Sequence, residues 1–171
     1  ANLMIDLAYG LWSVADVLPK SGKFQEEVDA NVEAAQFFRT FAFKDPAVPG
    51  RHGDLFRAYY RVASSFMRIA KDATPELNVN KELCYSRALK YYSAAKVVME
   101  RVPEQGRKKV IDPAFAQAVQ QVLDELNGLL REMNVDPASI ELMTPGEVGP
   151  NFPLPPAQLQ NLAVHHAAPR K

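Results

Sequence analysis

The stretch that decides the fold is DLFRAYYRVASSFMRIAK, residues 54–71, followed by NKELCYSRALKYYSAAKVVMERV, residues 80–102. In the first part, apolar side chains recur in steps of three and four, at Leu55, Tyr59, Val62, Phe66 and Ile69. The second part repeats this spacing at Cys84, Ala88, Tyr91, Ala95, Val98 and Val102. Such spacing keeps one side of an α-helix facing a core, so residues 54–102 predict a hairpin of two long helices.

The outer side of this predicted hairpin is basic, although the whole chain has no net charge. Residues 39–109 carry fifteen Lys and Arg against seven Asp and Glu; residues 1–38 carry two against six, and residues 110–171 carry three against seven. The candidate phosphate-binding side chains are Arg57, Arg61, Arg68, Lys71, Arg87, Lys90 and Arg101. Two interpretations stay open: the acidic flanks neutralise the hairpin, within one subunit or between neighbours, or the hairpin binds nucleic-acid phosphates without reading sequence.

The chain before the hairpin predicts two further helices. Residues 2–18 are apolar nearly all round, so this helix is expected either to lie centrally in a bundle or to dock into another subunit. Leu11 and Trp12 are its candidate assembly contacts. The stretch has no basic start and is interrupted by Asp6 and Asp16, which favours a structural helix over a signal peptide. Residues 24–43 form the second helix, and four Phe side chains near its end are expected in the core.

Connections are predicted from proline, glycine and capping residues. Residues 44–53 hold two Pro and two Gly and predict a rigid loop, with Asp54 as the N-cap of the next helix. Residues 105–109 predict a short basic turn. Asp112-Pro113 predicts the start of another amphipathic helix, and Asp136-Pro137 a short helical turn ending near residue 143.

The last 28 residues differ in character from the rest. Residues 144–171 hold six of the thirteen prolines and predict an extended C-terminal arm rather than a further bundle helix. Its candidate assembly contacts are the apolar side chains of Phe152, Leu154, Leu159 and Leu162. The sequence therefore predicts an all-α fold: an antiparallel bundle of about five helices in residues 1–143, followed by a Pro-rich arm.

Signatures of catalysis or of metal binding are not found in this sequence. It holds no glycine-rich phosphate loop, nucleophile elbow, HExxH motif or Glu-x-x-His pair. Cys84 falls on an apolar stripe and is expected to be a buried small hydrophobe. His165 and His166 have no third ligand at a suitable spacing. We therefore expect no enzyme activity, no cofactor and no metal site.

Composition restricts where such a chain works. A hydrophobic share of 47% and a charged share of 23% are typical of a soluble globular protein. No run reaches the roughly 18 apolar residues of a membrane span. The single cysteine fits a reducing compartment. The expected location is the cytoplasm or the interior of a virion.

Residues 41–102 also resemble the helical hairpin of phage proteins that sequester cyclic-nucleotide immune signals. The entry Phe41-Ala-Phe43-Lys44-Asp-Pro46 matches that family's aromatic-x-aromatic-basic-x-Pro pattern. A first helix then ends at a proline, and a second helix opens near Glu82. The late tryptophan of the family is missing, and the turn between the helices is longer here. The resemblance implies a small cyclic nucleotide held between subunits, with Lys44 and Arg57 as phosphate contacts.

Taken together, these observations favour a non-enzymatic structural subunit that assembles with itself, such as a viral or phage coat or nucleoprotein. The N-terminal helix and the C-terminal arm would hold a homo-oligomer or filament together. The basic hairpin would then bind nucleic-acid phosphates or the acidic flank of a neighbouring subunit. The alternative is the phage-type sponge for small cyclic nucleotides.

Overall fold

A computed structural model describes residues 3–75 and 79–143, and within these residues the protein is all-α, as the sequence predicts. The described elements are α1 (Leu3–Val17), η1 (Leu18–Ser21), α2 (Phe24–Lys44), α3 (Pro49–Asp72), α4 (Lys81–Arg101), α5 (Glu104–Val110), α6 (Pro113–Glu132) and η3 (Pro137–Ser139). The two η elements are short 3₁₀ turns. The predicted C-terminal arm, residues 144–171, lies outside the described residues.

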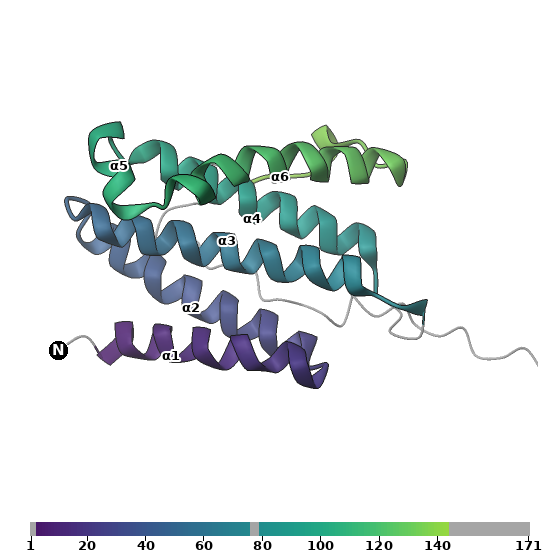
Figure 1. Ribbon diagram of the computed structural model, residues 1–171, viewed down its shortest axis with the longest axis horizontal. Helices are drawn as coiled ribbons and strands as arrows, with labels where there is room; N and C mark the ends of the chain where they lie inside the picture. Colours follow the sequence, from purple (N-terminus) through teal and green to yellow (C-terminus); the bar gives the residue numbers. More distant parts are fainter. Residues whose placement is uncertain (1–2, 76–78, 144–171) are drawn as a thin grey trace, which may run out of the picture.

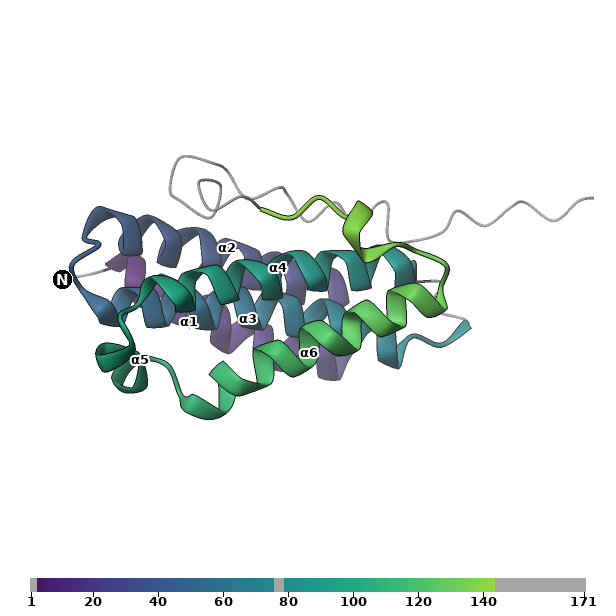
Figure 2. The ribbon, with the colours of Figure 1, turned by 90° about the horizontal axis from the view of Figure 1, so that it is seen from above.

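Consecutive long helices lie side by side and reverse direction from one to the next (Figure 1). Helix α1 packs on α2, α2 on α3, α3 on α4, and α6 on α4. The short helix α5 lies at the end of the molecule that also holds the α2–α3 connection, and contacts α3 (Figures 1 and 2). This order makes α1 and α6 the outermost long helices and places α3 between them.

The α3–α4 hairpin forms the centre of the core, and its apolar stripes are buried in full. The exposed fraction of every stripe side chain named for the two helices is 3% or less. Tyr59 of α3 and Tyr91 of α4 are paired with their ring centroids 6.1 Å apart, and Phe66 stacks on Tyr91 at 6.2 Å. Arg39 of α2 is also fully buried, and its positive charge lowers the pKa of both tyrosines against the larger rise from burial. The sequence periodicity did not indicate that this arginine is buried.

Two connections are more helical than the sequence predicted. Helix α3 begins at Pro49, not at Asp54, so only residues 45–48 remain a loop. Pro49 has the fixed φ that suits the first turn of a helix, where its missing N–H costs nothing. Residues 104–110 form helix α5 instead of a basic turn, which gives six α-helices rather than five among the described residues. By contrast, the helical turn predicted to reach residue 143 stops at Ser139.

Three predicted or implied caps are formed by side chains. Asn80 accepts the Leu83 N–H at 3.0 Å at the start of α4. Asp112 accepts the Ala114 N–H at 2.8 Å at the start of α6. Both cap residues satisfy a backbone donor that the first helical turn leaves without a partner. Asp136 does the same for the short turn η3.

Gly53 fixes how closely α5 approaches α3, and its replacement by alanine is expected to destabilise the fold. An added Cβ would lie 2.4 Å from the carbonyl oxygen of Val110, a backbone atom that cannot move alone. We expect Gly53→Ala to cost about 1–3 kcal/mol, the usual cost of overpacking. Gly128→Ala is the matched control, because nothing lies within 4 Å of its added Cβ. That variant should gain up to about 1 kcal/mol from helix propensity. Chemical unfolding of both variants measures the contrast; equal stabilities would contradict it.

Candidate interaction surfaces

The predicted basic face of α3 is already paired with acidic side chains of the same chain. Each of its four cations contacts at least one carboxylate: Arg57 pairs with Asp54, Arg61 with Asp16, Arg68 with Glu27 and also with Asp72, and Lys71 with Glu125. Two of the acids lie on α1 and α2, and one lies on α6. Asp16, Glu27 and Glu125 belong to the acidic flanks, so the flanks pair with three of these four cations within one subunit, in line with the first interpretation of the charge distribution.

The seven predicted cations do not share one face. Arg57 and Arg61 lie toward α1, because their guanidinium groups stand over the Trp12 ring at 6.0 and 5.0 Å. Lys71 lies toward α6. On α4, Arg87 acts on the pKa of the buried Tyr91, and Arg101 stands over the Phe43 ring at 5.7 Å at the end of the helix. Arg68 lies toward α2, over the Phe24 ring at 5.7 Å, and the half-buried Lys90 lies on α4. The structure thus divides the predicted site into several local contacts.

A buried polar network joins α2 to α3, and the sequence pattern did not reveal it. Glu27 is 4% exposed and accepts a hydrogen bond from the Ser65 hydroxyl at 2.8 Å and another from Arg68. The Asn31 amide donates to the Ser65 hydroxyl at 3.0 Å, and the Arg61 guanidinium reaches the Asn31 carbonyl oxygen at 3.4 Å. Each buried polar side chain of this network thus has a hydrogen-bond partner, which is the condition for such a network to stabilise a fold.

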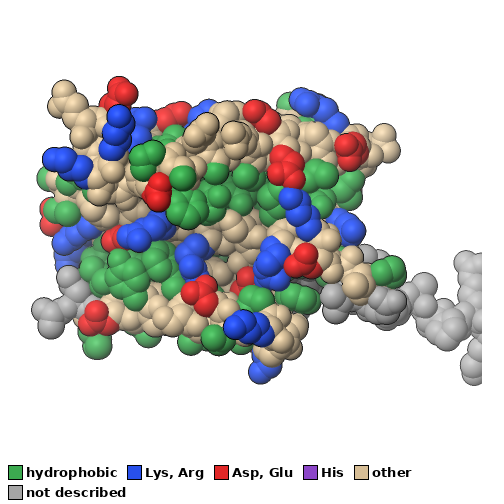
Figure 3. Space-filling view, in the orientation of Figure 1, with side chains coloured by type: hydrophobic (Ala, Val, Ile, Leu, Met, Phe, Trp, Pro, Cys, Tyr) green, Lys and Arg blue, Asp and Glu red, His purple; other side chains and the backbone are tan. Residues whose placement is uncertain are grey.

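An open groove runs along α3 between α1 and the start of α6. Two hollows, of about 300 and 440 Å³, share Tyr60, Arg61 and Phe115 and so form one continuous depression. The first is lined by aromatic side chains and two arginines: Tyr9, Trp12, Phe56, Arg57, Tyr60, Arg61 and Phe115. The second continues along α3 to Ser64, Ser65 and Arg68. We call this depression the α3 groove. Figure 3 shows apolar side chains gathered on either side of α3, with Lys and Arg side chains between them.

The rings in the α3 groove hold one another in place. Tyr60 meets Phe115 and Tyr92 edge to face, each at 5.1 Å between centroids. The hydroxyl groups of Tyr92 and Ser64 share a hydrogen bond at 2.8 Å. Edge-to-face rings are a favourable arrangement in a packed cluster. Phe115 is nevertheless 44% exposed, so the cluster is open to solvent on the α6 side.

Helix α1 has two apolar faces, and only one of them is buried. Ala8, Trp12 and Ala15 pack into the core. On the opposite side Leu3, Leu7, Val14 and Val17 are exposed by 79, 49, 49 and 59%. With Gly10 they follow steps of four, three, four and three, the spacing of a coiled-coil seam. We call these five residues the α1 outer face. Of the ten exposed large apolar side chains in the described residues, six belong to α1.

The predicted assembly contacts are distributed differently. Trp12 is 8% exposed and packs on Phe38 inside the chain, with ring centroids 4.5 Å apart. Leu11 is partly buried against the core. The four arm contacts, Phe152, Leu154, Leu159 and Leu162, lie outside the described residues. The apolar side chains that α1 presents to solvent are instead those of its outer face, which the sequence pattern marked as apolar without showing which side was covered.

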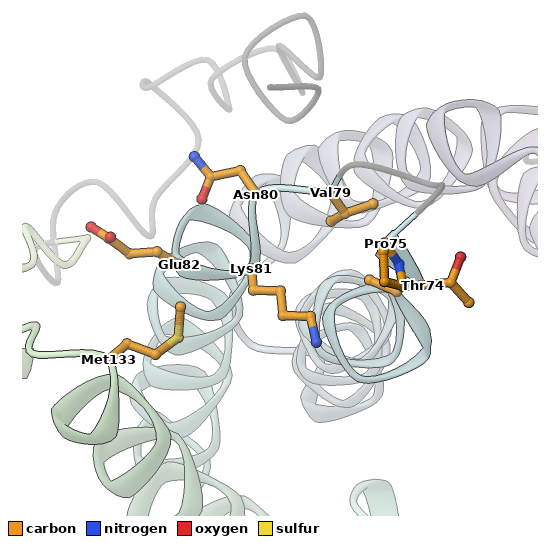
Figure 4. Close-up of a pocket in the computed structure, with 8 residues that line it drawn as sticks. Thr74, Pro75, Val79, Asn80, Lys81, Glu82 and Met133 are labelled. Carbon is orange, nitrogen blue, oxygen red and sulfur yellow. The ribbon is translucent and has the colours of Figure 1, made fainter. Parts of the chain in front are cut away.

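A third hollow, of about 480 Å³, lies where the α3–α4 connection meets the end of α6 (Figure 4). Its polar side chains do not converge on a common point: Lys81 and Glu82 extend in different directions in Figure 4. The side-chain oxygen of Asn80 is already used in capping α4. Because a ligand site needs several polar groups aimed at one place, we assign no site here.

Comparisons with protein-family models, with curated proteins and with solved structures found no match. Within the described residues, no cluster of three or more His, Cys, Asp and Glu side chains is placed to hold a metal ion. None of the described helices is both long enough and apolar enough to cross a membrane. The sponge resemblance implies Lys44 and Arg57 as phosphate contacts. Lys44 is exposed at the end of α2. Arg57 is paired with Asp54 of its own helix.

The buried thiol of Cys84 is expected to be unreactive in the folded protein. Its side chain is fully buried, and burial raises the pKa of the thiol to about 11. Since the thiolate is the reactive form, a thiol reagent should label Cys84 only as fast as the protein unfolds. The labelling rate should therefore rise with denaturant in step with the loss of helix. Rapid labelling of the native protein would contradict the burial.

Proposed function

We propose that this chain is a non-enzymatic assembly subunit that associates with copies of itself through the α1 outer face. The observation that supports it is the exposure of that face: four large apolar side chains stand at coiled-coil spacing on one helix and lie outside the core. Large apolar patches of this kind mark interaction sites on soluble proteins. The predicted arm, residues 144–171, would add a second contact to a neighbouring subunit.

The pairing of the basic hairpin favours this proposal over phosphate binding as the primary function. Arg57, Arg61 and Arg68 already have carboxylate partners in the same chain. A polyanion would have to displace these partners before it gained the same contacts. The α1 outer face has no such competitor among the described residues, where its large side chains are 49–79% exposed. Burying it removes apolar surface from water, the main favourable term in protein association.

Sedimentation velocity of the full chain over a range of concentrations tests the proposal. The wild-type chain should sediment faster as concentration rises, whereas Leu7→Asp/Val14→Asp should remain a monomer. Two charges in a desolvated interface should weaken association by about 30-fold or more, as the loss of an interface hot spot does. The control is Gln121→Asp, which adds a charge at an exposed position of α6. A wild-type chain that stays monomeric at every concentration would sink the proposal.

A chain truncated before Thr144 separates the arm from α1. If α1 makes the main contact and the arm strengthens it, the truncated chain should still associate, but more weakly. Loss of all association on truncation, together with unchanged association of Leu7→Asp/Val14→Asp, would place the contact on the arm and contradict the role of α1.

A further inference from the structure

We infer that the α1 outer face of one subunit docks into the α3 groove of the next, so that copies join head to tail. This inference rests on the proposed self-association and identifies the surface that receives α1. The two surfaces use different side chains: the α1 outer face points away from the core, whereas the groove runs along α3 toward the start of α6 and has the other side of α1 as one wall.

Interface area argues against two α1 outer faces simply packing on each other. A strip one helix wide, about 10 Å, and fifteen residues long, about 22 Å, has a footprint of roughly 220 Å². The accessible surface above it is larger than this flat footprint, but the exposed parts of its four large side chains still fall short of the roughly 800 Å² of accessible surface that a standard stable interface buries on each partner. A helix that enters a groove is instead covered on its flanks as well as on its seam. The groove therefore offers α1 more contact than a second α1 does.

The lengths of the two surfaces agree. From Leu3 to Val17 the α1 outer face rises by about 21 Å. Along the floor of the α3 groove, Phe56 to Arg68 rises by about 18 Å. Apolar side chains at steps of three and four are the usual anchors of a helix in a groove. The aromatic rings of Tyr60 and Phe115 form an apolar surface near the middle of that length.

The charges of the two surfaces are complementary at one end of the groove. Helix α1 contains no Lys or Arg. In the groove, Arg61 and Arg68 are paired with Asp16 and Glu27, which line it as well, whereas the Arg57 end has no acidic side chain in its lining. Asp6 lies beside the α1 outer face, one residue before Leu7, so a docked α1 can bring its carboxylate to the exposed Arg57 of the next subunit. Asp6 is exposed and makes no ion pair within the described part of the chain.

The existing ion pairs leave room for these contacts. The Arg57 side chain is 51% exposed although it pairs with Asp54. A guanidinium group has five N–H donors, so one carboxylate partner does not exhaust it. Exposed pairs are also weak, which makes their rearrangement inexpensive. A second carboxylate can therefore join Arg57 without breaking the fold.

A head-to-tail contact is heterologous, since it joins two different surfaces, and it propagates into a ring or a filament. It also predicts complementation between variants. A chain with a damaged α1 outer face keeps its groove, and a chain with a damaged groove keeps its α1. In a mixture of the two chains, the intact α1 outer face of the groove variant can dock into the intact groove of the α1 variant. No second contact can form. A symmetric contact between two α1 faces cannot be rescued in this way.

The test mixes Leu7→Asp/Val14→Asp with the groove variant Arg57→Ala/Phe115→Asp and measures size by sedimentation velocity. Each variant alone should be monomeric, and the equimolar mixture should contain a heterodimer and nothing larger. Circular dichroism must show that both variants keep their helices; Phe115→Asp alone serves in place of the groove variant if the double substitution unfolds. Raising the salt concentration should weaken the heterodimer, because exposed charges are screened.

The outcomes separate this inference from the proposed function. If the groove variant associates as strongly as the wild-type chain, the groove is not the acceptor, and self-association through α1 still stands. If each variant alone is monomeric and the equimolar mixture is monomeric as well, the head-to-tail contact is overturned. A wild-type chain that never associates refutes the proposed function itself.

Discussion

Raising the pH above about 10 is expected to unfold this protein in one cooperative step, with the tyrosines ionising as the helices are lost. Burial is the largest cause of a raised pKa in each of the six tyrosines, and it raises the pKa of Tyr91 and Tyr92 to about 12 from an ordinary value of 10. The neutral phenol fits the core, and the charged phenolate does not.

The sign of the effect follows from which state keeps the proton. Above pH 10 the unfolded chain releases tyrosine protons that the folded chain retains. The contribution of the buried tyrosines to the free energy of unfolding is therefore fully present below pH 10 and falls as the pH rises toward the pKa of the folded state. A rise in pKa from 10 to about 12 corresponds to roughly 3 kcal/mol for each of Tyr91 and Tyr92. Together these losses are comparable with the whole stability of a small domain, about 5–15 kcal/mol.

Tyrosinate absorbance and circular dichroism, followed in the same alkaline titration, measure this expectation. The two signals should change together, at a pH above the ordinary tyrosine value. Tyr92→Phe should move the transition to higher pH, because it removes one of the groups whose ionisation drives unfolding. If all the tyrosines ionised near pH 10 while the helices stayed intact, that result would contradict the burial of the α3–α4 tyrosines.

Replacing Glu27 by alanine is expected to destabilise the fold by about 3 kcal/mol, as the removal of one partner from a buried ion pair does. Glu27 is 4% exposed and serves both Ser65 and Arg68. Without it, the Ser65 hydroxyl loses its acceptor, and Arg68 keeps only its contact with the exposed Asp72 at 3.7 Å. Burying such groups without a partner is the source of the cost.

Chemical unfolding of Glu27→Ala and of the control Glu26→Ala measures this effect. Glu26 is exposed in the same turn of α2, so its removal should change the stability by no more than about 0.5 kcal/mol. The double variant Glu27→Ala/Arg68→Ala should be less damaged than the sum of its single variants, since the second change removes the charge that the first deprives of its buried partner. Equal losses for Glu26→Ala and Glu27→Ala would contradict the network.

The sequence predicted the all-α class and most helix positions because both depend on local patterns. The apolar steps of α3, α4 and α6 need only a core on one side. Asn80 and Asp112 cap their helices through contacts two or three residues away. The start of α3 was placed too late because Gly50 and Gly53 suggested a loop, whereas Pro49 opens a helix and Gly53 is required by the nearby Val110 backbone. That contact is distant in sequence.

The surfaces were harder to predict, since they depend on which helix covers which face. The cations of α3 were visible in the sequence, but three of their partners, Asp16, Glu27 and Glu125, lie on three other helices. Likewise, periodicity alone could not assign Trp12 to the core and Leu7 to the surface, because α1 is apolar on both sides. The packing of α1 against α2 determines which face of α1 is buried.

The most direct test of the α1 outer face as a contact between subunits is the reactivity of a thiol placed on it. Gly10→Cys adds that thiol at the centre of the face, where nothing lies within 4 Å of the added Cβ, and the buried Cys84 contributes no background. The labelling rate with a bulky maleimide is measured from micromolar to millimolar protein, with Glu33→Cys on the exposed side of α2 as the control. The rate at position 10 should fall as the concentration rises, while the rate at position 33 stays constant. A rate at position 10 that does not change with concentration would contradict the account.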